Sequence, residues 1–201
     1  MVKMAHRPLA RADLPIDSEA LARFLIGKIV VRQLPEGIVS GRIVETEAYI
    51  VGDAAGHAYR GMTPRNRSLF LEPGRAYVYL AYGVSYMLNV SSETPGIGAG
   101  VLIRALEPLD GVAVMQRNRG VERLRDLARG PGRLAAALRI DRTLDGLDLC
   151  RKGPLWLAPG DEQAGEIGES VRIGISRDAE RVLRFYLRGS PFVSGPRALT
   201  A

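Results

Sequence analysis

Apolar and polar residues alternate with a period of two along much of this chain, a pattern typical of half-buried β-strands. The segments Lys28–Leu34 and Gly37–Tyr49 both follow it. Pro35 and Glu36 form the short turn between them, so the two segments predict an early antiparallel hairpin.

More strands are expected further along the chain. Ala76–Leu80, Met87–Ser91 and Val101–Leu106 are dense in β-branched and aromatic residues, which favour strands. Two last strands are expected at Val171–Ile175 and Leu183–Leu187. The turns between many of these segments are too short for helical crossovers, which favours an antiparallel sheet.

Helical segments are fewer. A first helix is expected to run to Phe24 from a cap at Asp17 or Ser18. A second is expected over Pro108–Arg119, and a third begins at Pro131, since proline is favoured in the first turn of a helix. Strands thus outnumber helices.

These elements predict an α+β fold: a single mixed domain with a curved, mainly antiparallel β-sheet flanked by helices. We expect the domain to span residues 17–194, with an N-terminal lead-in at 1–16 and a C-terminal tail at 195–201. The segment Val51–Pro73 is rich in Gly, Pro and polar residues and is too long for a plain connection. Long loops in compact domains are usually functional or mobile.

The composition supports a folded and basic protein. Hydrophobic residues make up 46% of the 201 residues and charged residues 25%, as in ordinary globular domains. The net charge is +6, and only Lys3, Lys28 and Lys152 are lysines. An arginine-rich excess suits bidentate phosphate contacts, although it also fits an ordinary solvated surface or a GC-rich genome.

Metal and membrane functions are not indicated. Cys150 is the only cysteine, so there is no disulfide framework and no thiolate zinc site. The two histidines, His6 and His57, are too few for a multi-histidine site. No apolar run reaches the length of a membrane span, and no signal-peptide core is found. We expect a soluble cytoplasmic protein with no metal and no cofactor.

Three acidic and aromatic residues share one face of the second strand. Strand geometry places Glu45, Glu47 and Tyr49 together and Val44 and its alternating neighbours on the other face. Two carboxylates are costly to bury unless they have a use. One interpretation is a strand with its polar side in water; the other is a general base at the strand's end, where the long loop begins.

Tyrosines are concentrated in one short segment. Four of the seven lie between Tyr77 and Tyr86, and Tyr82 falls at a turn marked by Gly83. Tyrosine combines a flat stacking surface with a polar tip, which suits base stacking and insertion into a duplex. A cross-strand tyrosine ladder is the equal alternative.

Several polar residues interrupt otherwise apolar or glycine-rich segments. His57 lies in the long loop, where a hydrogen-bonding or solvent-exposed role is the commoner one. Arg104 interrupts an apolar strand and must find a carboxylate or a polar cavity. Asn89 is a similar intrusion. The arginines of the long loop and of Arg117–Arg133 would contact phosphates, or form a solvated face.

Seven segments, in order, resemble the alkyladenine (3-methyladenine) DNA glycosylase family, and the match runs from about residue 16 to about residue 194. They are Gly41–Tyr49 (GRIVETEAY), His57, Thr63–Arg67 (TPRNR), Tyr77–Gly83 (YVYLAYG), Asn89–Ser92 (NVSS), Val101–Pro108 (VLIRALEP) and Arg184–Pro191 (RFYLRGSP).

The resemblance implies a set of roles at the reacting bond. Glu47 matches the general base that deprotonates the attacking water. Arg104, with the backbone carbonyl near Ile175, matches the groups that hold this water. Tyr49 and His57 match one wall of the base pocket.

The remaining roles concern the base and the duplex. Tyr79 matches the opposite stacking wall, and Asn89 a pocket residue that in some members rejects the amine of guanine. Tyr82 matches the residue inserted into the duplex. Further DNA contacts are implied for the residues Arg65, Arg67, Gly83, Val84 and Ser85. Val84 and Ser85 are smaller than the pair found in some relatives, a departure at the wedge.

The activity implied is base excision without a metal. Glycosylases flip a damaged purine out of duplex DNA, and a carboxylate stabilises the oxocarbenium-like transition state of N-glycosidic hydrolysis. We expect alkylated or deaminated purines as substrates, a monomer, and no lyase activity, since no well-placed lysine is apparent. A non-enzymatic nucleic-acid binder and a small-molecule nucleosidase are the rivals; the first leaves Glu47 unexplained and the second Tyr82.

Overall fold

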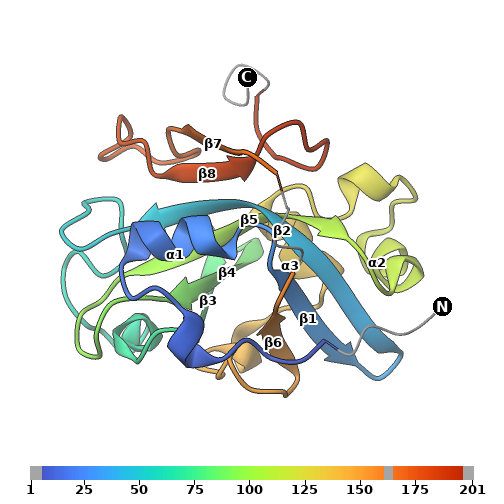
Figure 1. Cartoon of the computed structure of the whole chain (residues 1–201), viewed down its shortest axis with the longest axis horizontal. Helices are drawn as coiled ribbons and strands as arrows, with labels where there is room; N and C mark the ends of the chain where they lie inside the picture. Colours follow the sequence, from blue (N-terminus) through green and yellow to red (C-terminus); the bar gives the residue numbers. More distant parts are fainter. Residues whose placement is uncertain (1–5, 161–164, 197–201) are drawn as a thin grey trace.

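A curled antiparallel sheet organises the chain, which the computed structural model describes over residues 6–160 and 165–196 (Figure 1). The strands occur in the hydrogen-bonded order β3-β4-β5-β2-β1-β6, with β8 pairing β2 and β7 pairing β8. Their bounds are β1 Ile29–Leu34, β2 Gly37–Tyr49, β3 Ala76–Ala81, β4 Ser85–Ser91, β5 Gly100–Pro108, β6 Leu155–Ala158, β7 Ile167–Ser170 and β8 Arg184–Leu187.

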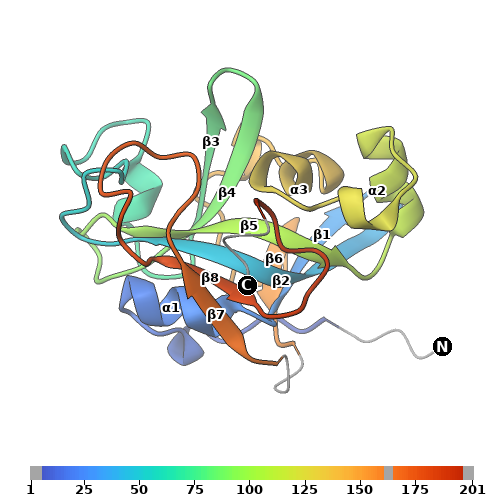
Figure 2. The ribbon, with the colours of Figure 1, turned by 90° about the horizontal axis from the view of Figure 1, so that it is seen from above.

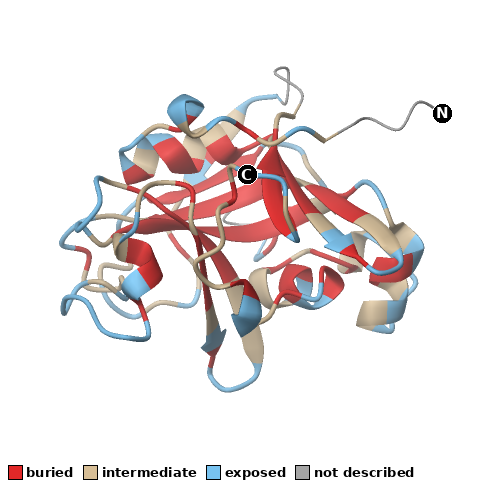
Figure 3. Cartoon of the chain, turned by 90° about the horizontal axis from the view of Figure 1, so that it is seen from below, coloured by how far each residue is buried: buried red, intermediate tan, exposed pale blue. Residues whose placement is uncertain are grey.

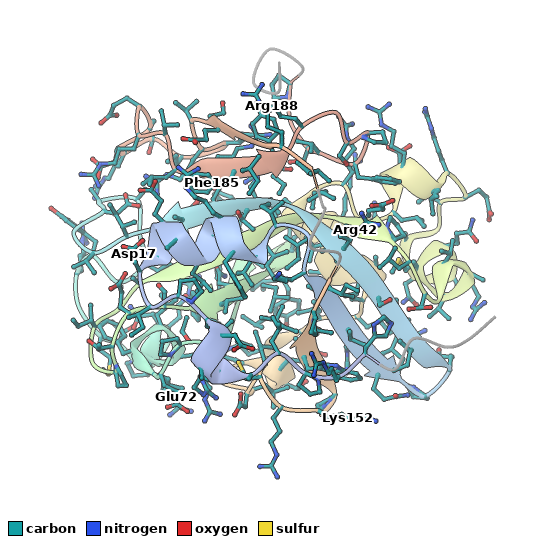
Figure 4. All side chains as sticks on the ribbon, in the orientation of Figure 1. Asp17, Arg42, Glu72, Lys152, Phe185 and Arg188 are labelled. Carbon is teal, nitrogen blue, oxygen red and sulfur yellow. The ribbon has the colours of Figure 1, made fainter. Side chains whose placement is uncertain are left out.

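Helices cover both faces of this sheet. α1 (Ser18–Leu25) lies on one face, while α2 (Val112–Arg119) and α3 (Pro131–Ala137) lie on the other, as Figure 2 shows. The Asp17 side chain at the start of α1 (Figure 4) accepts a hydrogen bond from Ala20 N at 2.8 Å, which satisfies an otherwise unpaired amide of the first turn. The expected α+β domain with a curved antiparallel sheet is confirmed.

The long strand β2 is the structural centre. It pairs with β1 in its first half, and with β5 and β8 in its second half. The register with β5 shifts twice. The first shift leaves Val44 as an extra residue in β2, between Ile43 opposite Leu106 and Glu45 opposite Ala105. The second leaves Arg104 as an extra residue in β5, because Thr46 lies opposite Ile103. Such bulges re-aim side chains, and this one lies where the polar residues of both strands meet.

The hairpin β1–β2, strands β3, β4, β5 and β8, and helices α1 and α3 lie where the alternation and capping signals predict them. The second helix was predicted too early: Pro108 ends β5, and the helix begins at Val112. Gly111 caps it in a left-handed conformation, φ +69°, which glycine adopts without strain.

The strand predicted at Val171–Ile175 is wrong. The nearest strand is β7, which ends at Ser170. Arg172 is buried in an ion pair with Asp53, and Gly174 has φ +79°, so the backbone leaves the sheet here. Strand β6 was missed, because its four apolar residues are surrounded by turn-forming residues and pair only with the distant β1.

The two ends are partly packed into the domain. In the predicted lead-in, Leu9 is buried and its amide donates to Leu157 O at 2.9 Å. Near the other end, Val193 and Ser194 are buried. Residues 1–5 of the lead-in and 197–201 of the predicted tail lie outside the described residues.

Candidate active site

A pocket of about 820 Å³ opens beside the β3–β4 hairpin, between the long loop and the segment 173–177. This volume is within the range of small-molecule sites. Its lining is aromatic and polar: Tyr49, His57, Tyr77, Tyr79, Tyr82, Asn89, Arg104 and Ile175 all contribute. The structure therefore brings together the residues predicted for a base pocket.

Glu47 lies directly behind this lining, with no solvent exposure. Its Oε1 accepts from Ile173 N at 2.7 Å and pairs with Arg104 Nη1 at 3.2 Å. Its Oε2 accepts from the Tyr49 hydroxyl at 3.1 Å. Ile173, Tyr49 and Arg104 all line the pocket, so the carboxyl contacts three groups of the pocket wall. The alternative of a strand with its carboxylates in water does not hold.

The burial of Glu47 controls its charge. Desolvation raises the pKa of Glu47, and it outweighs the opposing effects of the Arg104 charge and of the hydrogen bonds from Ile173 and Tyr49. The pKa of Tyr49 is raised by burial and by the neighbouring Glu47 charge, so the phenol stays protonated and donates to the carboxylate. A carboxylate whose pKa is raised is a stronger base and is better suited to accept a proton.

Arg104 bridges two carboxylates and is itself only 7% exposed. Its Nε donates to Glu45 Oε1 at 3.0 Å, while Nη1 faces Glu47. The expected structural ion pair and the expected place in the pocket wall are both present. The guanidinium is thus held by Glu45 on one side and presented to the pocket on the other.

The segment that carries Ile173 and Ile175 is fixed by a second buried ion pair. Arg172 pairs with Asp53, and the Arg172 guanidinium carbon lies 4.7 Å from the centre of the Tyr49 ring. The contact orders one face of Tyr49 and places Ile173 N on Glu47. The backbone contact to Glu47 found here is thus the Ile173 amide, whereas Ile175 lines the pocket.

His57 and the strand tyrosines form one aromatic group. The rings of Tyr77 and Tyr79 stack with centroids 5.3 Å apart. His57 Nδ1 is 2.8 Å from the Tyr77 hydroxyl, and its ring contacts Tyr79 edge-on at 4.3 Å. His57 therefore lies against Tyr79 here, rather than on a separate wall with Tyr49. Asn89 is fixed nearby, since its Nδ2 donates to Tyr77 O at 3.1 Å.

The hairpin tip projects from the molecule, and Figure 3 shows it as exposed. Tyr82 is 92% exposed and Val84 82% exposed. Tyr82 and Gly83 both have positive φ, at 51° and 69°, and Val84 N donates to Ala81 O at 2.9 Å, which closes a tight hairpin turn. Ser85, half-buried, begins β4. Tyr82 and Val84 together place apolar side chains at an exposed tip.

The predicted phosphate contacts lie near this hairpin. Arg65 and Arg67 are both exposed. Arg65 Nη2 also donates to Leu80 O at 3.3 Å, on the outer edge of β3. Arg65 therefore contacts the hairpin backbone and also carries an exposed positive charge.

Sequence reasoning missed the buried partners of the site. Glu45 was recognised as a polar residue of β2, but its contacts with Arg104, Arg184 and Ser194 were not. No local signal reports them, since Arg184 and Ser194 are more than 130 residues from Glu45 along the chain, as the separations of 139 and 149 show. Asp53, the partner of Arg172, was likewise hidden in the loop.

Within residues 6–160 and 165–196, no cluster of three or more histidine, cysteine, aspartate or glutamate side chains is placed to hold a metal ion. In the same described ranges, no helix combines the length and the apolar character that crossing a membrane requires.

The sequence matches known proteins over nearly its whole length. A family model described as methylpurine-DNA glycosylase matches residues 13–191. A protein of Mesorhizobium japonicum is 80% identical over 194 residues, covering 96% of this chain and 93% of the relative. One of Paraburkholderia phytofirmans is 53% identical, with 96% and 90% covered. One of Rubrobacter xylanophilus is 49% identical, with 88% and 92% covered. All three bear the name "Putative 3-methyladenine DNA glycosylase".

Proposed function

Because this chain belongs to the methylpurine-DNA glycosylase family, we propose that it flips alkylated or deaminated purines out of duplex DNA and hydrolyses their N-glycosidic bonds. It is a DNA-repair enzyme of the N-glycosyl hydrolase class. Its substrates in this proposal are 3-methyladenine, 7-methylguanine, hypoxanthine and ethenoadenine in duplex DNA, and its product is an abasic site.

The observation that carries the proposal is the place of Glu47. It is fully buried, yet each of its three polar contacts is a group of the pocket wall. Its Oε2 accepts only from Tyr49 among the described residues. A carboxylate oxygen has a second lone pair, so Oε2 retains an acceptor position for one water molecule.

The reaction then follows from these groups. Glu47 takes a proton from the water, whose oxygen bonds to C1′ of the sugar while the bond from C1′ to the purine nitrogen breaks. The purine leaves with the electron pair of that bond, which neutralises a base that alkylation has made cationic. Hypoxanthine and ethenoadenine are neutral in DNA, so each takes up a proton from solvent as it leaves. The Glu47 carboxylate also stabilises the positive charge that develops on the sugar. The Arg104 guanidinium orients the water.

Lesion preference is assigned to the aromatic wall. The purine is proposed to stack between Tyr49 and Tyr79, whose π faces favour positively charged rings by a cation–π term of about 0.5–2 kcal/mol. Asn89 limits which exocyclic groups fit. Tyr82 is proposed to fill the space that the flipped nucleotide leaves in the duplex.

The enzyme is proposed to be monofunctional and monomeric. A lyase reaction needs an amine nucleophile near C1′. Lys28 and Lys152 do not line the pocket, and Lys3 lies outside the described residues.

Single-turnover base release from a duplex with one 7-methylguanine tests the proposal. Glu47→Gln should lower the rate by about 10²- to 10⁴-fold, the usual contribution of a general base, and should leave binding of the duplex intact. Glu107→Gln is the matched control, since Glu107 lies on the neighbouring strand and pairs with Arg42 near the surface, at 3.3 Å. Normal base release by Glu47→Gln would overturn the assignment.

A further inference from the structure

Glu45 is a fully buried carboxylate close to the pocket, and it does not line the pocket. Its Oε1 accepts from Arg104 Nε at 3.0 Å, Arg184 Nε at 2.7 Å and Ser194 Oγ at 3.0 Å. Its Oε2 accepts from Ser194 N at 2.7 Å. Four donors from three separate segments therefore converge on a carboxylate that has no solvent exposure.

Only one of these donors reaches the pocket. Arg104 lines it, whereas Arg184 and Ser194 lie behind it. With Nε on Glu45 and Nη1 on Glu47, the Arg104 guanidinium is fixed at two of its three nitrogens. No contact of its Nη2 with another described residue is found, so this nitrogen remains for a ligand in the pocket.

We propose that Glu45 is a positioning residue, which holds the Arg104 side chain in the pocket wall at the orientation that base excision requires. Arg184 and the Ser194 end of the chain hold Glu45 in turn. The inference rests on the proposed function, because it assigns Glu45 a part in that same reaction.

A purely stabilising role does not account for this arrangement. Apolar residues of similar volume usually stabilise a core as well as a buried ion pair does, since they avoid the desolvation of two charges. Arg104 is moreover the extra residue of a β-bulge, which aims its side chain at both glutamates. An irregular register and a desolvated carboxylate are expected where geometry matters for function.

The charges around Glu47 come from every element packed against it. On β2 these are Glu45 and Tyr49, on β3 Tyr79, on β5 Arg104 and on β8 Arg184, which lies opposite Glu47 in the strand register. The segment after β7 adds Arg172, which interacts with Glu47 electrostatically. The charge of Glu45 raises the pKa of Glu47, in addition to the larger effect of burial.

The first variant is Glu45→Gln, compared with wild type and Glu107→Gln. Single-turnover base release from a 7-methylguanine duplex is measured over a range of pH. We expect the rate at the pH plateau to fall by about 10- to 100-fold, the cost of misplacing a catalytic group by about an ångström. The acid limb should move to lower pH, because a neighbouring negative charge has been removed. Glu107→Gln should change neither.

A second variant keeps the test decisive if Glu45→Gln does not fold. Arg184→Lys keeps the positive charge and changes the hydrogen bond to Glu45. It should lower the plateau rate and leave the acid limb in place. Circular dichroism and thermal unfolding of each variant establish which proteins are folded.

The outcomes are distinct. A wild-type plateau rate in folded Glu45→Gln overturns the inference, and so does a lower plateau with an unmoved acid limb. If Glu45→Gln is unfolded, a wild-type rate in Arg184→Lys overturns it. Glu47→Gln on the same duplex separates the two proposals. Normal base release by Glu47→Gln overturns the proposed function. An inactive Glu47→Gln together with a fully active Glu45→Gln overturns only the positioning role of Glu45.

Discussion

The imidazole of His57 packs edge-on against the ring of Tyr79, with the two centroids 4.3 Å apart. A purine sandwiched between two rings needs them roughly 7 Å apart, since each stacking contact takes about 3.5 Å. For His57 and Tyr79 to lie on opposite faces of a purine, His57 therefore has to move outward. Two hydrogen bonds would have to change for this movement, one between His57 Nδ1 and the Tyr77 hydroxyl and one from Asn66 Nδ2 to His57 O, both 2.8 Å long.

A neutral His57 is the first expected result. Surrounding protein atoms lower the pKa of His57 below 6.5, and the Arg65 charge lowers it further. The ring should therefore titrate below 6.5 in an NMR experiment, with the His6→Gln variant identifying the signal of the only other histidine. Arg65→Ala should raise the pKa of His57 part of the way back.

Arg67→Ala is the control for this titration, because Arg67 is not among the charges that shift His57. A His57 pKa above 6.5 in the wild-type protein would contradict the electrostatic description of the pocket rim. A His57 pKa that Arg65→Ala leaves unchanged would contradict it too.

The pH dependence of base release should report Glu47. The ionised carboxylate is the active form, so the rate should rise with pH through a pKa above 4.5 and then level off. The same shift has a consequence for stability. A carboxyl whose pKa is raised on folding binds its proton more tightly in the native state, so its contribution to stability declines as pH rises above 4.5.

Glu47→Gln should therefore unfold at a temperature no lower than wild type at neutral pH, since Arg104 keeps Glu45 as its partner. Thermal unfolding at several pH values measures this. A large loss of stability in Glu47→Gln would mean that the carboxylate is retained for the fold rather than for chemistry.

Tyr82 should contribute to the interaction with DNA and not to the stability of the fold. It is 92% exposed, so Tyr82→Ala removes almost no packing and should change the free energy of unfolding by less than about 0.5 kcal/mol. The fluorescence change of an ethenoadenine duplex on binding should weaken, because the space in the duplex is no longer filled. Val84→Ala, at the same tip, is the matched comparison and should have the smaller effect. Equal signals for wild type and Tyr82→Ala would exclude the wedge.

Binding to undamaged duplex should depend steeply on salt, because arginine contacts with phosphates release counterions. Arg67→Ala should reduce the slope of the logarithmic plot by about one. Lys152→Ala removes a charge that is exposed beside β6 (Figure 4) and should leave the slope unchanged. A slope insensitive to Arg67 would place the phosphate contacts elsewhere.

The sequence predicted what short-range patterns encode. Period-two alternation located β2 with its bounds at Gly37 and Tyr49, and Pro131 located the start of α3. The pattern in Val171–Ile175 failed because Arg172 forms a long-range ion pair with Asp53, which no local alternation reveals. Tertiary contacts override propensity at such positions.

The sequence predicted which residues form the site, but not which of them contact one another. The family motifs brought Glu47, Tyr49 and Arg104 into one hypothesis, and the structure places them in contact. The contact of His57 with Tyr79 depends on how a long loop folds back, and the part of Glu45 depends on the remote Ser194. Both contacts join residues that are distant from each other in the sequence.

Because β2 carries buried groups of the site, its position affects how the range of damaged bases accepted could change. The carboxyl assigned to chemistry and its counter-charges sit on paired, buried strands, whereas the His57 loop and the tip at Tyr82 are exposed. Substitutions in those peripheral segments would change the rim of the proposed site and leave the buried carboxyl and its counter-charges in place. Under the proposed function, any selectivity that depends on this rim can vary without a change in the buried strands.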